Sequence, residues 1–250
     1  MNGVIEFLSD PAHWSGQDGV PQRLLQHLGY SLTALVIALV IALPLGLYVG
    51  HTGRGAVGIA GVANALRALP TFGLLLFVVV LSTGHLRGDL AYLGPALLVL
   101  IILGVPPVLS NTYAGVANVD PSVRDAARGM GMTGQQVLWR VEVPNALPLI
   151  ISGVRSAVLQ IVATATIAAY VSLGGLGRFI IDGQQQRDYP QMLAGAVLVA
   201  LLALVIDLVL ATVQRFVVSR GITGRHAKGR STRAADGGAG RPEASVEATA

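Results

Sequence analysis

Residues 125–144 read Asp-Ala-Ala-Arg-Gly-Met-Gly-Met-Thr-Gly-Gln-Gln-Val-Leu-Trp-Arg-Val-Glu-Val-Pro, the longest polar stretch between apolar segments that could cross a bilayer. The residues that lead into it predict a short helix, because Pro121 suits a first helical turn, where its missing N–H costs nothing. Three glycines then predict a break in that helix, since glycine readily adopts positive φ. They are Gly129, Gly131 and Gly134.

A second helical piece is predicted from Gln135 to Arg140. Pro144 is expected to end it, because proline lacks the N–H that would continue a helix. Two short helices joined by a glycine turn form a more ordered segment than a linker between membrane spans needs. We therefore interpret this loop, bounded at 120–144, as a docking site for a partner protein.

The composition is that of a membrane protein. The chain has 250 residues, of which 53% are hydrophobic and only 12% are charged, whereas soluble domains are about 25% charged. It contains no cysteine, which excludes disulfides, thiolate metal sites and a cysteine nucleophile. The net charge is +4, but basic residues gather after the last apolar segment, where they indicate membrane orientation rather than nucleic-acid binding. These residues are Arg220, Arg225, Lys228, Arg230, Arg233 and Arg241.

Five apolar segments predict an all-α polytopic membrane protein, because each is close to or longer than the roughly 20 residues that cross the hydrocarbon core. The predicted spans are residues 30–49, 56–81, 90–114, 146–170 and 192–217. The second span contains Pro70, and we interpret it as one long kinked span. Two short re-entrant pieces are the alternative.

The spans divide the chain into three parts. Residues 1–21 are predicted to be an extra-membrane segment with turn residues, and residues 22–217 to be the transmembrane domain. Residues 218–250 are rich in Gly, Ala, Ser, Thr and Arg without periodicity, which predicts a disordered basic tail. If loop 120–144 is cytoplasmic, basic residues are more numerous inside than outside, so the N-terminus is expected outside and the C-terminus inside.

Polar side chains within the spans are candidates for the transport path or for helix pairing, because charge in hydrocarbon is costly. Arg155 and Asp207 each lie about ten residues, or about 15 Å, from the inner end of a span, so we expect them to share a polar network. Asn64 and Arg67 lie one helical turn apart, and with Asn111 they are further candidates for the path. Packing is the alternative for Asn64 and Arg67, and for the stretch that holds Asn111 the alternative is that Tyr113 anchors the span at the membrane interface.

No catalytic or cofactor site is apparent in the sequence. The stretch Gly174-Gly175-Leu176-Gly177 is followed by no Lys-Ser or Lys-Thr pair and preceded by no strand, so we interpret it as a helix stop and turn rather than a nucleotide site. The five histidines have no metal-ligand spacing. We therefore expect neither a metal nor a bound cofactor, and we expect any ATP to be hydrolysed by another subunit.

The loop resembles the EAA loop of ABC-importer permeases. That pattern is Glu-Ala-Ala, three residues, Gly, nine residues, Ile, one residue and Leu-Pro, and the spacing here is the same. The chain departs from it by Asp for Glu and by Val at both aliphatic positions, which keeps the sign of the charge and the apolar character. The matching residues, which the resemblance implies couple the permease to its ATPase, are Asp125, Ala126, Ala127, Gly131, Val141, Val143 and Pro144.

Further stretches are similar to one branch of these permeases, the osmoprotectant importers for glycine betaine, carnitine, choline and proline. These stretches are residues 63–71, 106–115, 118–121, 142–148 and 174–177. The resemblance implies a type I importer fold with about five core spans per subunit and a coupling helix in the cytoplasmic loop.

The resemblance also implies partners: two cytoplasmic ATPase subunits, an external substrate-binding protein, and a second permease copy or a related permease. Quaternary ammonium groups are typically held in aromatic cages, and only 5% of this chain is aromatic, so we expect the binding protein to supply the high-affinity site. An importer of another small solute, such as an amino acid, is the nearest alternative. A secondary transporter or a channel would not need an ATPase-docking loop.

Overall fold

The computed structural model describes residues 2–82, 85, 87–88, 90–171 and 173–217. All regular structure in these residues is helical, which confirms the predicted all-α class. The helices are α1 (Asn2–Ser9), α2 (Val20–Thr52), α3 (Ala56–Ala68), α4 (Thr71–Ser82), α5 (Leu90–Ala117), α6 (Pro121–Gly129), α7 (Gly134–Val137), α8 (Val143–Ala165), α9 (Gly177–Gln186) and α10 (Tyr189–Val217). Shorter segments are the 3-10 helices Pro11–Trp14 and Ile167–Val171 and the π-helix Leu138–Glu142. The predicted basic tail, residues 218–250, lies outside the described residues.

Four helical segments are long and apolar enough to cross a membrane: α2, α5, the continuous stretch from Gly134 to Val171, and α10. The predicted first, third and fourth spans lie within the first three, and the fifth corresponds to α10. The α3–α4 pair makes a fifth crossing if its two helices count as one span.

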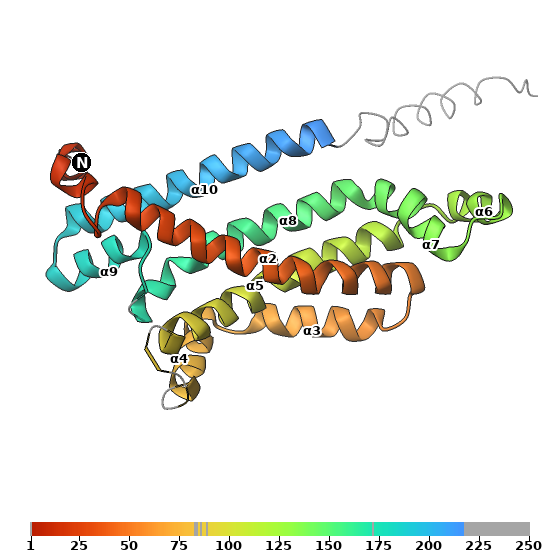
Figure 1. The fold of residues 1–250 in the computed structure, drawn as a ribbon, viewed down its shortest axis with the longest axis horizontal. Helices are drawn as coiled ribbons and strands as arrows, with labels where there is room; N and C mark the ends of the chain where they lie inside the picture. The colour runs from red at the N-terminus through yellow and green to blue at the C-terminus, as the bar shows by residue number, and fades with distance from the viewer. Residues whose placement is uncertain (1, 83–84, 86, 89, 172, 218–250) are drawn as a thin grey trace, which may run out of the picture. The chain divides into compact units, whose positions relative to one another are not determined.

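The second predicted span is not one continuous kinked helix. α3 ends at Ala68, α4 begins at Thr71, and the two helices are bent by 90° relative to each other (Figure 1). Pro70 causes the break, because a proline disfavours helical backbone in the residue before it, and Leu69 is extended with φ −70° and ψ 130°. The segment is therefore two helices, and their 90° bend fits either one broken span or two short re-entrant pieces.

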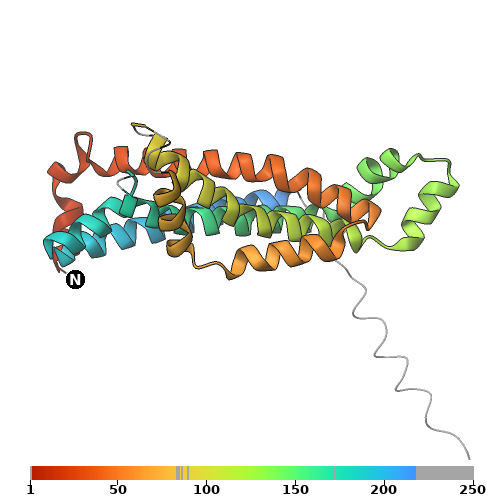
Figure 2. The ribbon, with the colours of Figure 1, turned by 90° about the horizontal axis from the view of Figure 1, so that it is seen from below.

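α2, α5 and α8 pack together at the centre of the described residues, and they run side by side in both ribbon views (Figures 1 and 2). α2 presents to its neighbours a stripe of small buried residues spaced four apart. The stripe consists of Ala34, Ala38, Ala42, Gly46 and Gly50. Small side chains at this spacing let helix backbones approach closely, which favours association in a membrane, where apolar burial gives no advantage over contact with lipid.

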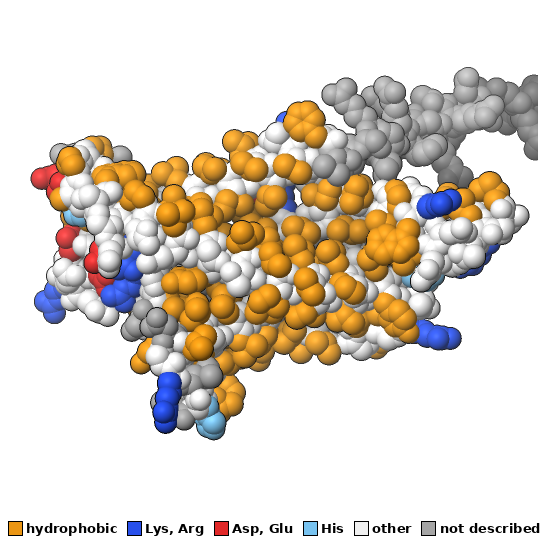
Figure 3. Space-filling model, viewed as in Figure 1, with side chains coloured by type: hydrophobic (Ala, Val, Ile, Leu, Met, Phe, Trp, Pro, Cys, Tyr) orange, Lys and Arg blue, Asp and Glu red, His pale blue; other side chains and the backbone are white. Residues whose placement is uncertain are grey.

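The two ends of this helical bundle differ. α1 and α9 lie at the end opposite to α6 and α7 (Figures 1 and 2). The aromatic rings of Phe7 on α1 and Phe179 on α9 pack edge to face, with centroids 5.9 Å apart. Neither α1 nor α9 was expected from the sequence, which predicted turns in the first segment and a glycine turn before the last span. Between the ends, Figure 3 shows hydrophobic side chains spread over the helices.

α8 approaches α5 closely at Gly153. A β-carbon there would stand 2.9 Å from the Pro107 carbonyl oxygen and 2.7 Å from Asn111 Cβ. Because the carbonyl is backbone and cannot rotate away, we expect Gly153→Ala to push the helices apart and lower the free energy of unfolding by about 1–3 kcal/mol. Gly58→Ala on α3 is the control, since its β-carbon would meet nothing within 4 Å. Thermal unfolding in detergent compares the variants, and equal melting temperatures would contradict this close packing.

Candidate functional site

The loop after α5 forms the short helix α6, as predicted. The Asp120 carboxylate caps it by accepting a 2.8 Å hydrogen bond from the Ser122 backbone N–H, and Pro121 occupies the first turn. This hydrogen bond holds the pKa of the Asp120 carboxyl below its usual value. The cap is therefore charged at neutral pH, which suits the positive end of a helix dipole.

Gly131 makes the turn that follows, with φ +82°, a backbone conformation that glycine adopts without steric cost. Thr133 then starts α7 with a capping box: its hydroxyl accepts from the Gln136 N–H, while the Gln136 side chain accepts from the Thr133 N–H. The other two glycines do not break a helix. Gly129 is the last residue of α6 and Gly134 is the first residue of α7.

Pro144 does not end the second helical piece, contrary to the prediction. The helix continues from α7 through the π-helical segment into α8. The π turn explains this, because the Val143 N–H bonds to the Leu138 carbonyl five residues earlier and so shifts the hydrogen-bond ladder. Pro144, which is exposed, then stands in the first turn of α8, where a missing N–H is tolerated.

The π-helical segment also carries a buried carboxylate that the sequence analysis missed. The Glu142 side chain is 1% exposed, and its Oε2 lies 2.6 Å from Nδ1 of His51 in the last turn of α2. Its Oε1 lies 2.9 Å from Nε of Arg124 on α6, an ion-pair contact without hydrogen-bond geometry. Arg124 also donates to the Val116 carbonyl at the end of α5. These three side chains, which we call the Glu142 cluster, therefore tie α6 to the last turn of α2, the end of α5 and the segment that leads into α8.

The spacing of these residues gives no hint of the cluster, because His51 and Glu142 are 91 residues apart in sequence. One signal was available: Glu142 stands between two valines where the loop meets an apolar segment. A carboxylate buried at such a place needs a cationic partner. The pattern does not say which cation that is.

The other residues that match the EAA pattern divide into an exposed and a packed set. Asp125 and Ala126 are exposed on α6, whereas Ala127 is buried on its inner face. The Asp125 carboxylate lies 3.8 Å from Arg128 and is 74% exposed. It does not cap α6, because the N-cap residue is Asp120. Val141 and Val143 are half-buried beyond α7. The outer face of α6 is therefore free for a partner, while its inner face is held to the bundle.

Arg155 on α8 and Asp207 on α10 form the contact that their depth in the spans predicted. Arg155 Nε lies 2.5 Å from Asp207 Oδ1, and Arg155 Nη2 lies 2.7 Å from Asp207 Oδ2. This bidentate geometry is the strongest form of an arginine–carboxylate contact. The pair joins α10 to the central helices.

We expect the losses of stability caused by substituting Arg155 and by substituting Asp207 to be coupled. Arg155→Ala and Asp207→Ala should each lower the melting temperature, because each leaves an unpaired charge in the membrane. The double variant should lose less than the sum of the two, since it removes both charges. Thermal unfolding of the four proteins measures this coupling, and simple additivity would contradict it.

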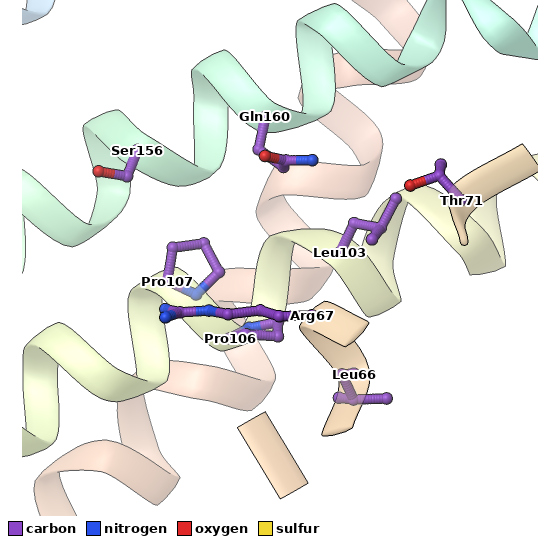
Figure 4. A pocket seen from close by; sticks show the side chains of 8 residues that line it. All are labelled: Leu66, Arg67, Thr71, Leu103, Pro106, Pro107, Ser156 and Gln160. Atoms are coloured by element: carbon purple, nitrogen blue, oxygen red, sulfur yellow. The ribbon is translucent and has the colours of Figure 1, made fainter. Parts of the chain in front are cut away.

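The three candidates for the path lie in different surroundings. Arg67 lines a cavity of about 360 Å³ between the α3–α4 junction, α5 and α8 (Figure 4). Asn64 is exposed one turn earlier on α3 and does not line this cavity. The Asn111 amide donates a 2.8 Å hydrogen bond to the Pro107 carbonyl within α5, so this side chain serves its own helix and the packing against α8.

The glycine stretch 174–177 makes the turn that the sequence predicted. Gly175 has φ +94°, and its N–H donates a 3.0 Å hydrogen bond to the Gln26 side chain near the start of α2. Gly177 is then the first residue of α9. Throughout the residues that the structure describes, no group of three His, Cys, Asp or Glu side chains could hold a metal ion.

Residues 26–221 match the family model described as binding-protein-dependent transport system inner membrane component. The glycine betaine/carnitine/choline transport system permease protein OpuCB of Bacillus subtilis is 34% identical over 200 residues, covering 80% of this chain and 88% of its own. The choline transport system permease protein OpuBB of the same organism is 33% identical over 223 residues, covering 89% and 97%. The osmoprotectant import permease protein OsmW of Salmonella typhimurium is 34% identical over 199 residues, covering 79% and 91%.

Two solved structures share the arrangement of helices. An inward-facing form of the MetNI methionine ABC transporter superimposes with a TM-score of 0.68 at 21% identity, over 84% of this chain and 100% of the other. An amino acid ABC transporter solved with histidines gives a TM-score of 0.61 at 18% identity, over 80% and 92%. At these identities the likeness shows a common fold.

Proposed function

Because the chain belongs to the family of binding-protein-dependent transport system inner membrane components, we propose that it carries osmoprotectants of the glycine betaine, choline, carnitine and proline class across its membrane. It is a multi-pass permease subunit of an ABC importer, with the type I importer fold. It is not an enzyme, since ATP is hydrolysed by a separate ATPase subunit of such transporters.

The substrate proposal is carried by one observation. Relatives that match along most of both chains are permeases for glycine betaine, carnitine, choline or osmoprotectants. The methionine transporter and the amino acid transporter solved with histidines share only the fold, at lower identity. The low aromatic content of this chain supports a division of labour, in which the external binding protein selects the solute and the permease provides a gated passage.

The coupling proposal rests on α6 and the Glu142 cluster. The exposed face of α6 enters a groove of a cytoplasmic ATPase subunit, and Asp125 and Ala126 lie on that face. When the ATPases close, the movement of α6 passes through Arg124 to Glu142 and His51. The inner ends of α2, α5 and α8 then move with α6 as one unit, which shifts the permease between two arrangements.

The same assignment sets the orientation of the chain. The end that carries α6 faces the cytoplasm, and the end that carries α1 and α9 faces outward and receives the binding protein (Figure 1). Basic residues favour the cytoplasmic side. Those at or next to this end are Arg54, Arg124, Arg128 and Arg140, and the sequence after α10 adds the six basic residues of the tail. The path itself is completed by a second permease, either another copy of this chain or a related one.

Uptake of radiolabelled glycine betaine tests this function. Proteoliposomes that contain this chain with its ATPase, loaded with ATP, should accumulate the solute only when the binding protein is added outside. The ATPase should also co-purify with the chain from detergent. Accumulation of an amino acid in place of glycine betaine would contradict the substrate class, and accumulation without the ATPase would contradict the ATP-driven mechanism.

A further inference from the structure

The cavity beside Arg67 is built where three irregular pieces of helix meet. α3 ends one residue after Arg67, α4 begins with Thr71, and α5 contains two consecutive prolines at the cavity wall. Figure 4 shows the Arg67 guanidinium extending along Pro106 and Pro107, with Ser156 and Gln160 of α8 on the other side of the cavity. The lining therefore carries one positive charge with hydroxyl and amide groups around it.

Arg67 has no carboxylate partner among the residues that the structure describes. This sets it apart from Arg155 on α8, which is paired with Asp207. A guanidinium at membrane depth is costly unless it meets water or an anion, and such residues mark substrate paths. The position in the last turn of α3 offers some compensation through the helix dipole, but a dipole satisfies none of the five N–H donors.

The α5 wall beside Arg67 carries backbone carbonyls that lack their usual donors. Pro106 and Pro107 have no N–H, so neither can donate to the backbone carbonyl four residues earlier on α5. The carbonyls concerned belong to Ile102 and Leu103, and Leu103 itself lines the cavity. Carbonyl oxygens without their helical donors suit the weakly acidic C–H groups that surround a quaternary ammonium. A guanidinium and carbonyl oxygens that lack their helical donors thus belong to the same α3–α5 side of one cavity, and these groups of opposite polarity complement a zwitterion.

We infer that Arg67 is a specificity-determining residue of the translocation path, which binds the carboxylate of a zwitterionic solute while the α5 carbonyls face its ammonium end. This inference rests on the proposed function and deepens it. Among quaternary ammonium solutes, those that carry a carboxylate bind in this cavity, and those that end in a neutral hydroxyl bind far more weakly because they add a second positive charge next to the guanidinium.

Direct binding to the permease–ATPase complex in nanodiscs, without the binding protein, tests the inference. The probe is radiolabelled glycine betaine, with unlabelled glycine betaine or choline as competitor. In the wild-type complex, choline should compete at least roughly tenfold more weakly than glycine betaine, the loss expected when a charged hydrogen bond is missing. Equal competition by choline would overturn the inference without any variant being needed.

Variants then assign the selectivity to one residue. Arg67→Gln should lower glycine betaine binding to the level of choline, and Arg67→Lys should retain part of it, because lysine keeps the charge without the bidentate geometry. Arg54→Gln is the matched control, an exposed arginine in the turn that precedes α3. Co-purification of the ATPase checks that each variant is assembled.

The outcomes separate this inference from the proposed function. Normal glycine betaine binding by Arg67→Gln, or an equal loss of glycine betaine and choline binding, would overturn the role of Arg67. That role would also be overturned if the complete wild-type importer accumulated glycine betaine while its permease showed no binding. Failure of the complete wild-type importer to accumulate any osmoprotectant would instead overturn the proposed function.

Discussion

Replacing Glu142 with alanine is expected to lower the free energy of unfolding by about 3–5 kcal/mol, because it leaves the Arg124 guanidinium without the counter-charge of this buried carboxylate. His51 and Arg124, which lie 2.6 Å and 2.9 Å from the carboxylate oxygens, would remain packed around an empty site. The link between α6 and the membrane helices should fail as a result. Uptake should fall to background even in preparations that still contain folded permease.

Two measurements check this expectation. Thermal unfolding in detergent reports stability, and glycine betaine-dependent ATP hydrolysis in proteoliposomes reports coupling. Glu142→Gln should lower the melting temperature less than Glu142→Ala does, since the amide keeps the volume of the side chain. It should still uncouple ATP hydrolysis from glycine betaine, because it removes the charge that holds Arg124. Asp18→Ala is the matched control: Asp18 also pairs with an arginine, but at an 88% exposed site, where such pairs contribute about 0–1 kcal/mol. Equal effects of Glu142→Ala and Asp18→Ala would contradict a central role for the cluster.

Gly131→Val is expected to abolish recovery of the ATPase with the permease while leaving membrane insertion intact. The turn between α6 and α7 has φ +82° at this residue, which costs an ordinary residue roughly 1–2 kcal/mol and a β-branched residue more. No atom lies within 4 Å of the position that a β-carbon would take, so the effect comes from the backbone and not from a clash. The turn should relax by changing the direction of α6 relative to α7. The exposed face of α6, which carries Asp125 and Ala126, should then be displaced from the ATPase.

The control for this second expectation is Gly16→Val. Gly16 has φ +83° and equally open surroundings, but it lies at the opposite end of the bundle, between the first 3-10 segment and α2. Both variants should lose similar stability, and only Gly131→Val should lose the ATPase in a pull-down from detergent. Recovery of the ATPase with both variants would show that the geometry of the α6–α7 turn is not needed for docking.

The sequence predicted those features that depend on local chemistry or on depth in the membrane. The long apolar segments, the helix that begins at Pro121 and the positive φ of Gly131 all follow from residues close together in the chain. The Arg155–Asp207 contact was found because depth can be counted from the ends of two antiparallel spans. In each case the structure is a direct consequence of helix geometry or of backbone sterics.

Other features depend on contacts that spacing does not show. Pro144 should have ended a helix, but a π turn in the preceding residues shifts the hydrogen-bond ladder and lets the helix continue. The kink expected at Pro70 is a full break, and nothing local sets the size of that bend. The Glu142 cluster joins residues from three segments of the chain. It could be recognised only once α2, α6 and the start of α8 were placed beside one another.

The contact between Arg155 and Asp207 has a consequence for biogenesis. α8 is synthesised before α10, so Arg155 enters the bilayer while Asp207 is still outside it, and the charge of each side chain opposes insertion of its own helix. The guanidinium is neutralised only when the last helix inserts and docks. A nascent chain that stops before α10 thus keeps an unpaired arginine within the membrane, so the last helix completes the charge balance of the helices that insert before it.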